Sequence, residues 1–179
     1  MIISEMQGKL ATWSTADKSR RFDRLLRIIA DRSWLREAAR ITLASKGART
    51  AGVDGITGAV MTAGLDAQLL SIRAELMAGT YQPQPARRIY IPKANGKLRP
   101  LGIPTLRDRI VQRAMLMGMD PIWESDFHRL SYGFRIGRSV HHAIRTTKFQ
   151  LQDCSVAKGR WVIEGDLASY FGYRFTTRY

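Results

Sequence analysis

Apolar residues recur at helical spacing through the first eighty residues of the chain. Three amphipathic helices are predicted, over roughly 16–30, from Ser33 to Gly47 and from Leu65 to Gly79. Ser14 and Asp17 resemble a capping box at the start of the first one, because the carboxylate can reach back to an unpaired amide. Residues 1–15 show little periodicity, so we expect a loose leader there.

The pattern changes to that of strands over residues 87–103. Ile89 and Ile91 alternate with Arg88 and Tyr90, which is the period of a half-buried strand. The dipeptide Asn95-Gly96 tolerates the positive φ of a tight turn, and an extended segment returns after it. The sequence therefore predicts a β-hairpin over 87–103.

Two further helices and one apolar run follow the hairpin. Thr105 and Asp108 form a capping-box pattern that opens a helix, which Pro121 is expected to end. Another helix is predicted over roughly 139–149. The apolar run over 161–167 carries Asp166 near its end and predicts a buried strand. Together these elements indicate an α+β fold.

The charge balance points to a polyanionic partner. The 179 residues carry 29 Lys and Arg against 15 Asp and Glu, a net charge of +14. Such a surface binds nucleic acid by releasing condensed counterions, with a steep dependence on salt. The alternative is a basic protein that is merely soluble, because net charge alone does not define a site.

Other features of the composition exclude several classes of protein. With 45% hydrophobic and 25% charged residues, the chain has the composition of a folded domain. No run approaches the roughly 18 apolar residues of a membrane helix, and no signal-peptide pattern opens the chain, so we expect a cytoplasmic protein with no membrane partner. The single Cys154 excludes an internal disulfide and a zinc module.

Several ordered sequence blocks resemble one known family. They are Gly52-Val53-Asp54-Gly55, Tyr81-Gln82-Pro83, the continuous run from Ile91 to Thr105, Asp108-Arg109, Gln112, Ser131-Tyr132-Gly133-Phe134-Arg135 and Gly137-Arg138-Ser139. These blocks closely resemble group II intron reverse transcriptases, also called maturases. The match runs from about residue 20 to residue 171.

The resemblance implies part of a right-hand polymerase. Within the match it implies a helical amino-terminal extension (16–80), fingers with the hairpin (81–159) and the first palm strand (160–171), which leaves the loose leader (1–15) before them and an aberrant tail (172–179) after them. It also implies three partners: RNA, as intron RNA or template-primer, a dNTP in the complete enzyme, and possible completion of the palm by a second chain.

The resemblance assigns active-site roles to a few residues. Asp166 would be the first of three carboxylates that hold two Mg²⁺ ions, which suits a hard oxygen ligand. Lys93 and Arg99 would lie over the dNTP phosphates, and Phe171 would crowd the sugar 2′ position. Without the resemblance, these residues are better explained as a turn-capping carboxylate, two exposed strand residues and a core aromatic.

A larger basic set is predicted to contact nucleic acid. It consists of Arg87, Arg88, Lys97, Arg107, Arg109, Arg113, Arg135 and Arg138. By similarity, the arginines at positions 107, 109, 113, 135 and 138 would contact the template backbone. For any one of them, a solvated surface position is an equal alternative.

The sequence departs from the family near its end. No acidic residue follows Asp166, and neither a Tyr-x-Asp-Asp loop nor any Asp-Asp pair occurs. One carboxylate cannot hold two Mg²⁺ ions against their mutual repulsion, so we expect no polymerase activity from this chain alone. Three hypotheses stand: a truncated, frameshifted polymerase fragment, an RNA-binding module, and a pseudogene product without function.

Overall fold

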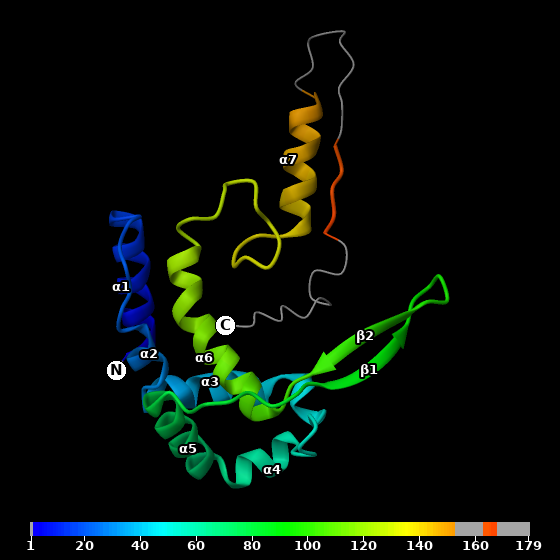
Figure 1. The fold of residues 1–179 in the computed structure, drawn as a ribbon. Helices are drawn as coiled ribbons and strands as arrows, with labels where there is room; N and C mark the ends of the chain where they lie inside the picture. Colours follow the sequence, from blue (N-terminus) through cyan, green and yellow to red (C-terminus); the bar gives the residue numbers. More distant parts are fainter. Residues whose placement is uncertain (1, 153–162, 168–179) are drawn as a thin grey trace, which may run out of the picture. The chain divides into compact units, whose positions relative to one another are not determined.

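The computed structural model describes residues 2–152 and 163–167. The chain divides into two compact units, Met1–Arg129 and Leu130–Tyr179 (Figure 1). The helices of the first unit are α1 (Ile3–Ala16), α2 (Leu25–Ile29), α3 (Arg32–Ala44), the short 3₁₀ helix η1 (Lys46–Arg49), α4 (Gly58–Ala63), α5 (Leu65–Ala78) and α6 (Leu106–Trp123). Its strands are β1 (Arg87–Pro92) and β2 (Leu98–Ile103), and α7 (Val140–Gln152) belongs to the second unit. The predicted mixture of helices with a small antiparallel sheet is confirmed.

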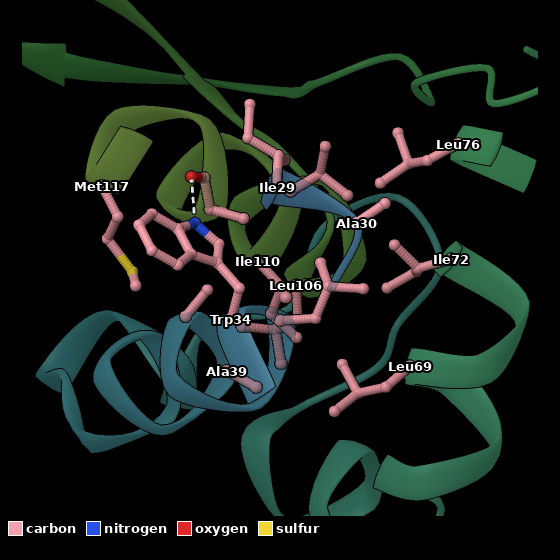
Figure 2. Packing of buried hydrophobic residues seen from close by; sticks show 14 of the residues in the cluster. Ile29, Ala30, Trp34, Ala39, Leu69, Ile72, Leu76, Leu106, Ile110 and Met117 are labelled. Carbon is pink, nitrogen blue, oxygen red and sulfur yellow. Dashed lines mark hydrogen bonds between the residues drawn. The ribbon is translucent and has the colours of Figure 1, made fainter. Parts of the chain in front are cut away.

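The core of the first unit lies where α3 crosses α6. Trp34 and Leu35 of α3 are fully buried against Leu106 and Ile110 of α6. The indole Nε1 of Trp34 donates a hydrogen bond of 2.9 Å to the backbone carbonyl of Ala114, the dashed line in Figure 2. The buried aromatic therefore keeps its one polar atom satisfied. The apolar face of α5 closes the core with Leu69, Ile72 and Leu76.

The expectation of a loose leader over 1–15 is wrong, because α1 occupies nearly all of it. Leu10 is buried, and Gln7 Nε2 donates to the carbonyl of Met117 at 2.9 Å. Ser14 Oγ donates to the carbonyl of Ile122 at 3.0 Å. These contacts with α6 stabilise a helix whose own sequence shows weak amphipathicity, since helices in proteins gain most of their stability from packing.

The predicted helix over 16–30 is mostly wrong for a related reason. Only Leu25–Ile29 form α2, and Asp17 follows the end of α1 rather than opening a helix. The Asp17 carboxylate accepts hydrogen bonds from the amide and hydroxyl of Ser19, at 2.9 and 2.7 Å. This local turn competes with a helix, as aspartate side chains commonly do. The chain therefore bends between α1 and α2.

Other predicted boundaries differ by a few residues. The cap of α3 is Asp31 rather than Ser33, because the Asp31 carboxylate accepts from the Ser33 amide at 2.9 Å. Gly47 lies within η1 instead of ending α3. Gly79 ends α5 as predicted, with the left-handed φ of +69° that glycine adopts most easily.

Pro121 lies inside α6 instead of ending it. A proline has no amide hydrogen, so the carbonyl four residues earlier loses its helical partner. That carbonyl belongs to Met117, and it is the one that accepts from Gln7 of α1. The helix continues to Trp123 because a neighbouring helix supplies the missing donor.

The predicted palm strand over 160–171 is not found in its described part. Residues 163–167 form no strand, and Ile163 and Leu167 are 95% and 72% exposed. Within the described ranges the sheet consists of β1 and β2 alone, so this segment has no neighbouring strand to pair with. A strand without a partner leaves its backbone groups unpaired. The rest of the predicted strand and the tail over 172–179 lie outside the described residues.

Candidate nucleic-acid interface

The predicted β-hairpin is confirmed, and a regular turn closes it. The Lys93 amide donates to the carbonyl of Lys97 at 2.7 Å, and the Gly96 amide donates to the carbonyl of Lys93 at 3.0 Å. Gly96 takes a φ of +75°, which makes the loop a turn followed by a left-handed glycine. The Asn95 side chain accepts from the Lys97 amide at 3.2 Å. The two lysines therefore lie at the tip of the hairpin.

The register of the two strands shows which basic residues share a face. Arg99 pairs with Ile91, and Arg87 pairs with Ile103. Side chains directly opposite one another, and those two apart along a strand, point to the same side of a sheet. Arg87 and Arg99 therefore share one face and are offset by about 13 Å along the strands, at ~3.3 Å per residue. Arg88 lies on the other face with Tyr90, which is 58% exposed.

The basic side chains of the hairpin face solvent. They are Arg87, Arg88, Lys93, Lys97 and Arg99, and all are exposed. Within the described residues none of these side chains makes a hydrogen bond or ion pair. The hairpin extends away from the helices of its unit (Figure 1). These cations are therefore available to phosphate groups, and Tyr90 supplies a ring on which a base can stack.

A buried carboxylate fixes the start of the hairpin. Asp108 of α6 is 3% exposed and accepts hydrogen bonds from Thr105 Oγ1 at 2.6 Å and the Gln84 amide at 3.2 Å. It also accepts from the Tyr81 hydroxyl, at 2.5 Å. Burial and the Asp108 carboxylate raise the pKa of Tyr81. The capping pair predicted from sequence thus also holds the segment that enters β1.

Arg109 fixes the end of the hairpin, which is a different role from the predicted contact with nucleic acid. Its Nε donates to the carbonyl of Pro104 at 2.9 Å. Its two terminal nitrogens donate to the carbonyls of Gly47 and Thr50, at 2.8 and 2.6 Å. All three guanidinium nitrogens therefore donate hydrogen bonds within the fold. These bonds connect Gly47 and Thr50, which follow α3, to Pro104, which follows β2.

Gly52 lets that loop approach the start of α6. A Cβ at this position would lie 2.7 Å from the Thr105 Cα and 2.8 Å from the Thr105 amide nitrogen. Within the same block, Gly55 has a φ of +69°, and the Asp54 carboxylate accepts from the Ile56 amide at 3.1 Å. The Gly52–Gly55 block therefore supports the base of the hairpin.

Arg107 is likewise engaged inside the fold. Its guanidinium forms an ion pair of 2.5 Å with Glu75 of α5, and it lies 5.9 Å from the centre of the Tyr81 ring. Hydrogen bonds from Ser71 and from Arg107 lower the pKa of Glu75. Arg113, by contrast, is exposed on α6 and remains a candidate contact.

Comparison with known proteins decides the family. Residues 91–172 match the family described as reverse transcriptase (RNA-dependent DNA polymerase). The chain contains part of a reverse transcriptase domain. The match begins at the end of β1 and includes the turn of the hairpin, β2 and α6, so Lys93, Lys97 and Arg99 lie within this domain. The resemblance inferred from the sequence blocks is thus confirmed.

Individual relatives connect this reverse transcriptase domain with group II introns. The chain is 70% identical to protein YkfC of Escherichia coli (strain K12) over 171 residues, which cover 96% of the chain and 45% of YkfC. It is 39% identical to the group II intron-encoded protein LtrA of Lactococcus lactis subsp. cremoris over 128 residues, 71% of the chain and 20% of LtrA. The chain therefore spans less than half the length of these relatives.

In the second unit, the two arginines that were predicted to contact nucleic acid, Arg135 and Arg138, make local interactions. Arg135 Nη1 donates to the carbonyl of Ser131 at 2.8 Å, and the Arg138 guanidinium lies 5.5 Å from the centre of the Tyr132 ring. The Tyr132 hydroxyl is 2.7 Å from Thr146 Oγ1 of α7. The two arginines thus stabilise the loop before α7. Neither is placed relative to the hairpin, since the hairpin belongs to the other unit.

The residues that the reverse transcriptase family would use to bind metal and the dNTP sugar are only partly described. Asp166 is exposed, and Phe171 lies outside the described residues. Across residues 2–152 and 163–167, no three side chains of His, Cys, Asp or Glu come together. The described residues therefore do not fit a site for two Mg²⁺ ions, and we assign no catalytic step to them. No described helix has the length and apolar character to cross a membrane.

Sequence reasoning missed two features of this interface. It did not single out Tyr90 as an exposed ring, although its position in the strand alternation was available. It also did not predict that Arg107 and Arg109 would be engaged inside the fold. The Arg107 partner Glu75 comes from α5, and two of the three Arg109 partners, Gly47 in η1 and Thr50 just after it, are far away in the sequence, so no local signal could have found them.

Proposed function

We propose that this chain supplies the fingers part of an RNA-directed DNA polymerase and binds RNA through the β1–β2 hairpin. The observation that carries the proposal is the set of exposed, unpaired cations on a hairpin whose two ends are fixed by Asp108 and Arg109. A fixed hairpin binds with less loss of conformational entropy than a flexible loop. In a complete active site with a dNTP bound, Lys93 and Arg99 would instead contact the triphosphate; in this chain alone they are available to RNA phosphates.

Phosphate binding follows from the charge and geometry of the hairpin. Arg87 and Arg99 on one face can neutralise two phosphates of one strand, while Lys93 and Lys97 reach further from the tip. Each neutralised phosphate releases counterions, which supplies affinity without base specificity. The exposed Tyr90 ring adds stacking on the opposite face.

Polymerisation with two Mg²⁺ ions requires active-site carboxylates in addition to Asp166, and the sequence lacks the Tyr-x-Asp-Asp loop that would supply them. Asp166 would supply one metal ligand, but no acidic residue follows it and no Asp-Asp pair occurs in the sequence. We therefore propose that the 179 residues bind RNA and do not extend a primer by themselves. The missing carboxylates would come from further polypeptide, either in a longer product or in a second chain.

The experiment compares two variants that lose the same charge. The hairpin variant combines Lys93→Gln, Lys97→Gln and Arg99→Gln. The control variant combines Lys46→Gln, Arg49→Gln and Arg73→Gln, which are exposed basic positions elsewhere in the first unit. Fluorescence anisotropy with a labelled RNA should show roughly ten-fold weaker binding for the hairpin variant and a much smaller effect for the control.

A primer-extension assay on the same preparations tests the catalytic part of the proposal. The 179-residue protein should give no DNA product with an RNA template, a primer, dNTPs and Mg²⁺. Extension by this protein would contradict the claim that it lacks a complete site. Equal weakening of RNA binding by both triple variants would contradict the assignment of the interface to the hairpin.

A further inference from the structure

Helices α1 and α2 lie at the opposite end of the first unit from the hairpin (Figure 1), and a second basic surface lies between α1 and the segment that contains α2. It is a hollow of about 650 Å³ between α1 and the segment that leads into and through α2. Its aromatic and basic lining residues are Trp13, Arg20, Arg21, Phe22, Arg24 and Arg27. None of them belongs to the hairpin or to the blocks that support it.

Two half-buried aromatic rings line the hollow. Trp13 comes from the last turn of α1, and Phe22 comes from the bend between α1 and α2. The Arg20 guanidinium lies 4.8 Å from the centre of the Trp13 ring and 5.8 Å from the centre of the Phe22 ring. This arrangement presents flat groups of the kind on which nucleobases stack.

The charge of the hollow favours an anionic ligand. Four arginines line it, against the single acidic residue Asp23. All four are exposed, and the side chains of Arg21, Arg24 and Arg27 make no hydrogen bond or ion pair within the described part of the chain. A simple phosphate would need the arginines but not the rings. A ligand that uses both has an aromatic group next to phosphates.

We infer that this hollow binds an unpaired nucleobase of single-stranded RNA, with the adjacent phosphates on Arg21, Arg24 and Arg27. The inference rests on the proposed binding of RNA by this chain and adds a second contact that recognises bases as well as charge. Stacking of a base on aromatic and guanidinium planes tolerates any sequence, since every base has a flat face. The hollow therefore distinguishes single-stranded RNA from a polyanion without bases.

The test uses two labelled oligonucleotides of nine nucleotides, an oligoadenylate and a strand of equal length and charge that lacks bases. The unsubstituted protein should bind the oligoadenylate more tightly. Phe22→Leu keeps apolar bulk but removes the flat ring, so it should weaken oligoadenylate binding about five-fold or more and leave binding of the abasic strand unchanged. Arg20→Gln, an exposed substitution, should act in the same direction.

The matched control is the pair Lys46→Gln and Arg49→Gln, which removes charge elsewhere without changing the preference for bases. Equal affinity of the unsubstituted protein for the two strands would overturn the inference. So would equal weakening of both strands by Phe22→Leu, or binding of a polyglutamate peptide of the same charge as tightly as oligoadenylate. If the hairpin variant loses RNA binding while Phe22→Leu does not, only this inference fails. If the unsubstituted protein binds no RNA, the proposed function fails as well.

Discussion

Gln7 of α1 donates a hydrogen bond of 2.9 Å to the carbonyl of Met117, the group that Pro121 leaves without a helical partner. The first helix of the chain thereby completes the hydrogen bonding of α6, one hundred and ten positions later. Since α6 also carries Asp108 and Arg109, which fix the hairpin, α1 supports the same helix that positions the candidate interface.

Substitution of Gln7 by Met tests this support. Methionine keeps the length of the side chain but has no amide to donate, so a part-buried carbonyl loses its partner. The free energy of unfolding should fall by about 1 kcal/mol or more. Urea unfolding monitored by circular dichroism measures the change, with Lys9→Met on the same helix as the control.

A double-mutant cycle then tests the specific link to proline. In a Pro121→Ala background the amide at position 121 can donate to Met117, so Gln7→Met should cost less than it does in the unsubstituted protein. A coupling free energy of about 1 kcal/mol is expected. Additive effects of the two substitutions would contradict the link.

Two glycine substitutions should change stability in opposite directions. Ala at position 52 would place its Cβ 2.7 Å from the Thr105 Cα, so the loop or the start of α6 must move, at a cost of about 1–3 kcal/mol. Gly8→Ala, in α1 with open space around it, should stabilise the protein by about 0.5–1 kcal/mol. Thermal unfolding of both variants checks this, and destabilisation by Gly8→Ala would contradict the helical state of α1.

The lowered pKa of Asp31 predicts that the free energy of unfolding depends on pH. Burial raises the pKa of its carboxyl, but hydrogen bonds from the Ser33 side chain and from the Trp34 and Ser33 amides outweigh burial and lower the pKa overall. A lowered pKa in the folded state means that the carboxylate stabilises the protein above its unfolded pKa of about 4, and that this contribution is lost as the pH falls through the folded value.

Asp31→Ala should therefore cost about 1 kcal/mol at pH 7, where the cap is charged. Asp31→Asn should unfold with a weaker dependence on pH below about pH 4 than the unsubstituted protein, because the amide does not titrate. Urea unfolding between pH 3 and 7 measures both effects. Identical pH profiles for the Asn variant and the unsubstituted protein would show that Asp31 has an ordinary pKa.

The elements that sequence could predict are those with local determinants. The hairpin follows from alternation and from Gly96, and the start of α6 follows from Thr105 and Asp108, whose hydrogen bonds close within three residues. In contrast, α1 depends on contacts with α6 that no local pattern contains. Residues 163–167 were predicted as a strand from apolar character alone, but a strand also needs a neighbour.

The candidate site was predictable to a similar extent. Exposed cations on the hairpin follow from the strand pattern and the net charge, and Lys93, Lys97 and Arg99 are exposed in the structure, whereas their contact with a dNTP or nucleic acid stays a prediction. The hollow lined by Trp13 and Phe22 was not predictable, because it depends on the bend that replaces the expected helix over 16–30.

The salt dependence of RNA binding tests the central claim most directly. The affinity for single-stranded RNA is measured between 50 and 300 mM salt for the unsubstituted protein and for the hairpin and control triple variants. Each phosphate contact contributes about 0.7 to the slope of log affinity against log salt, so the hairpin variant should have a slope shallower by about two. The control should keep the slope of the unsubstituted protein. Equal slopes for the two variants would show that net charge, rather than the hairpin, binds the RNA.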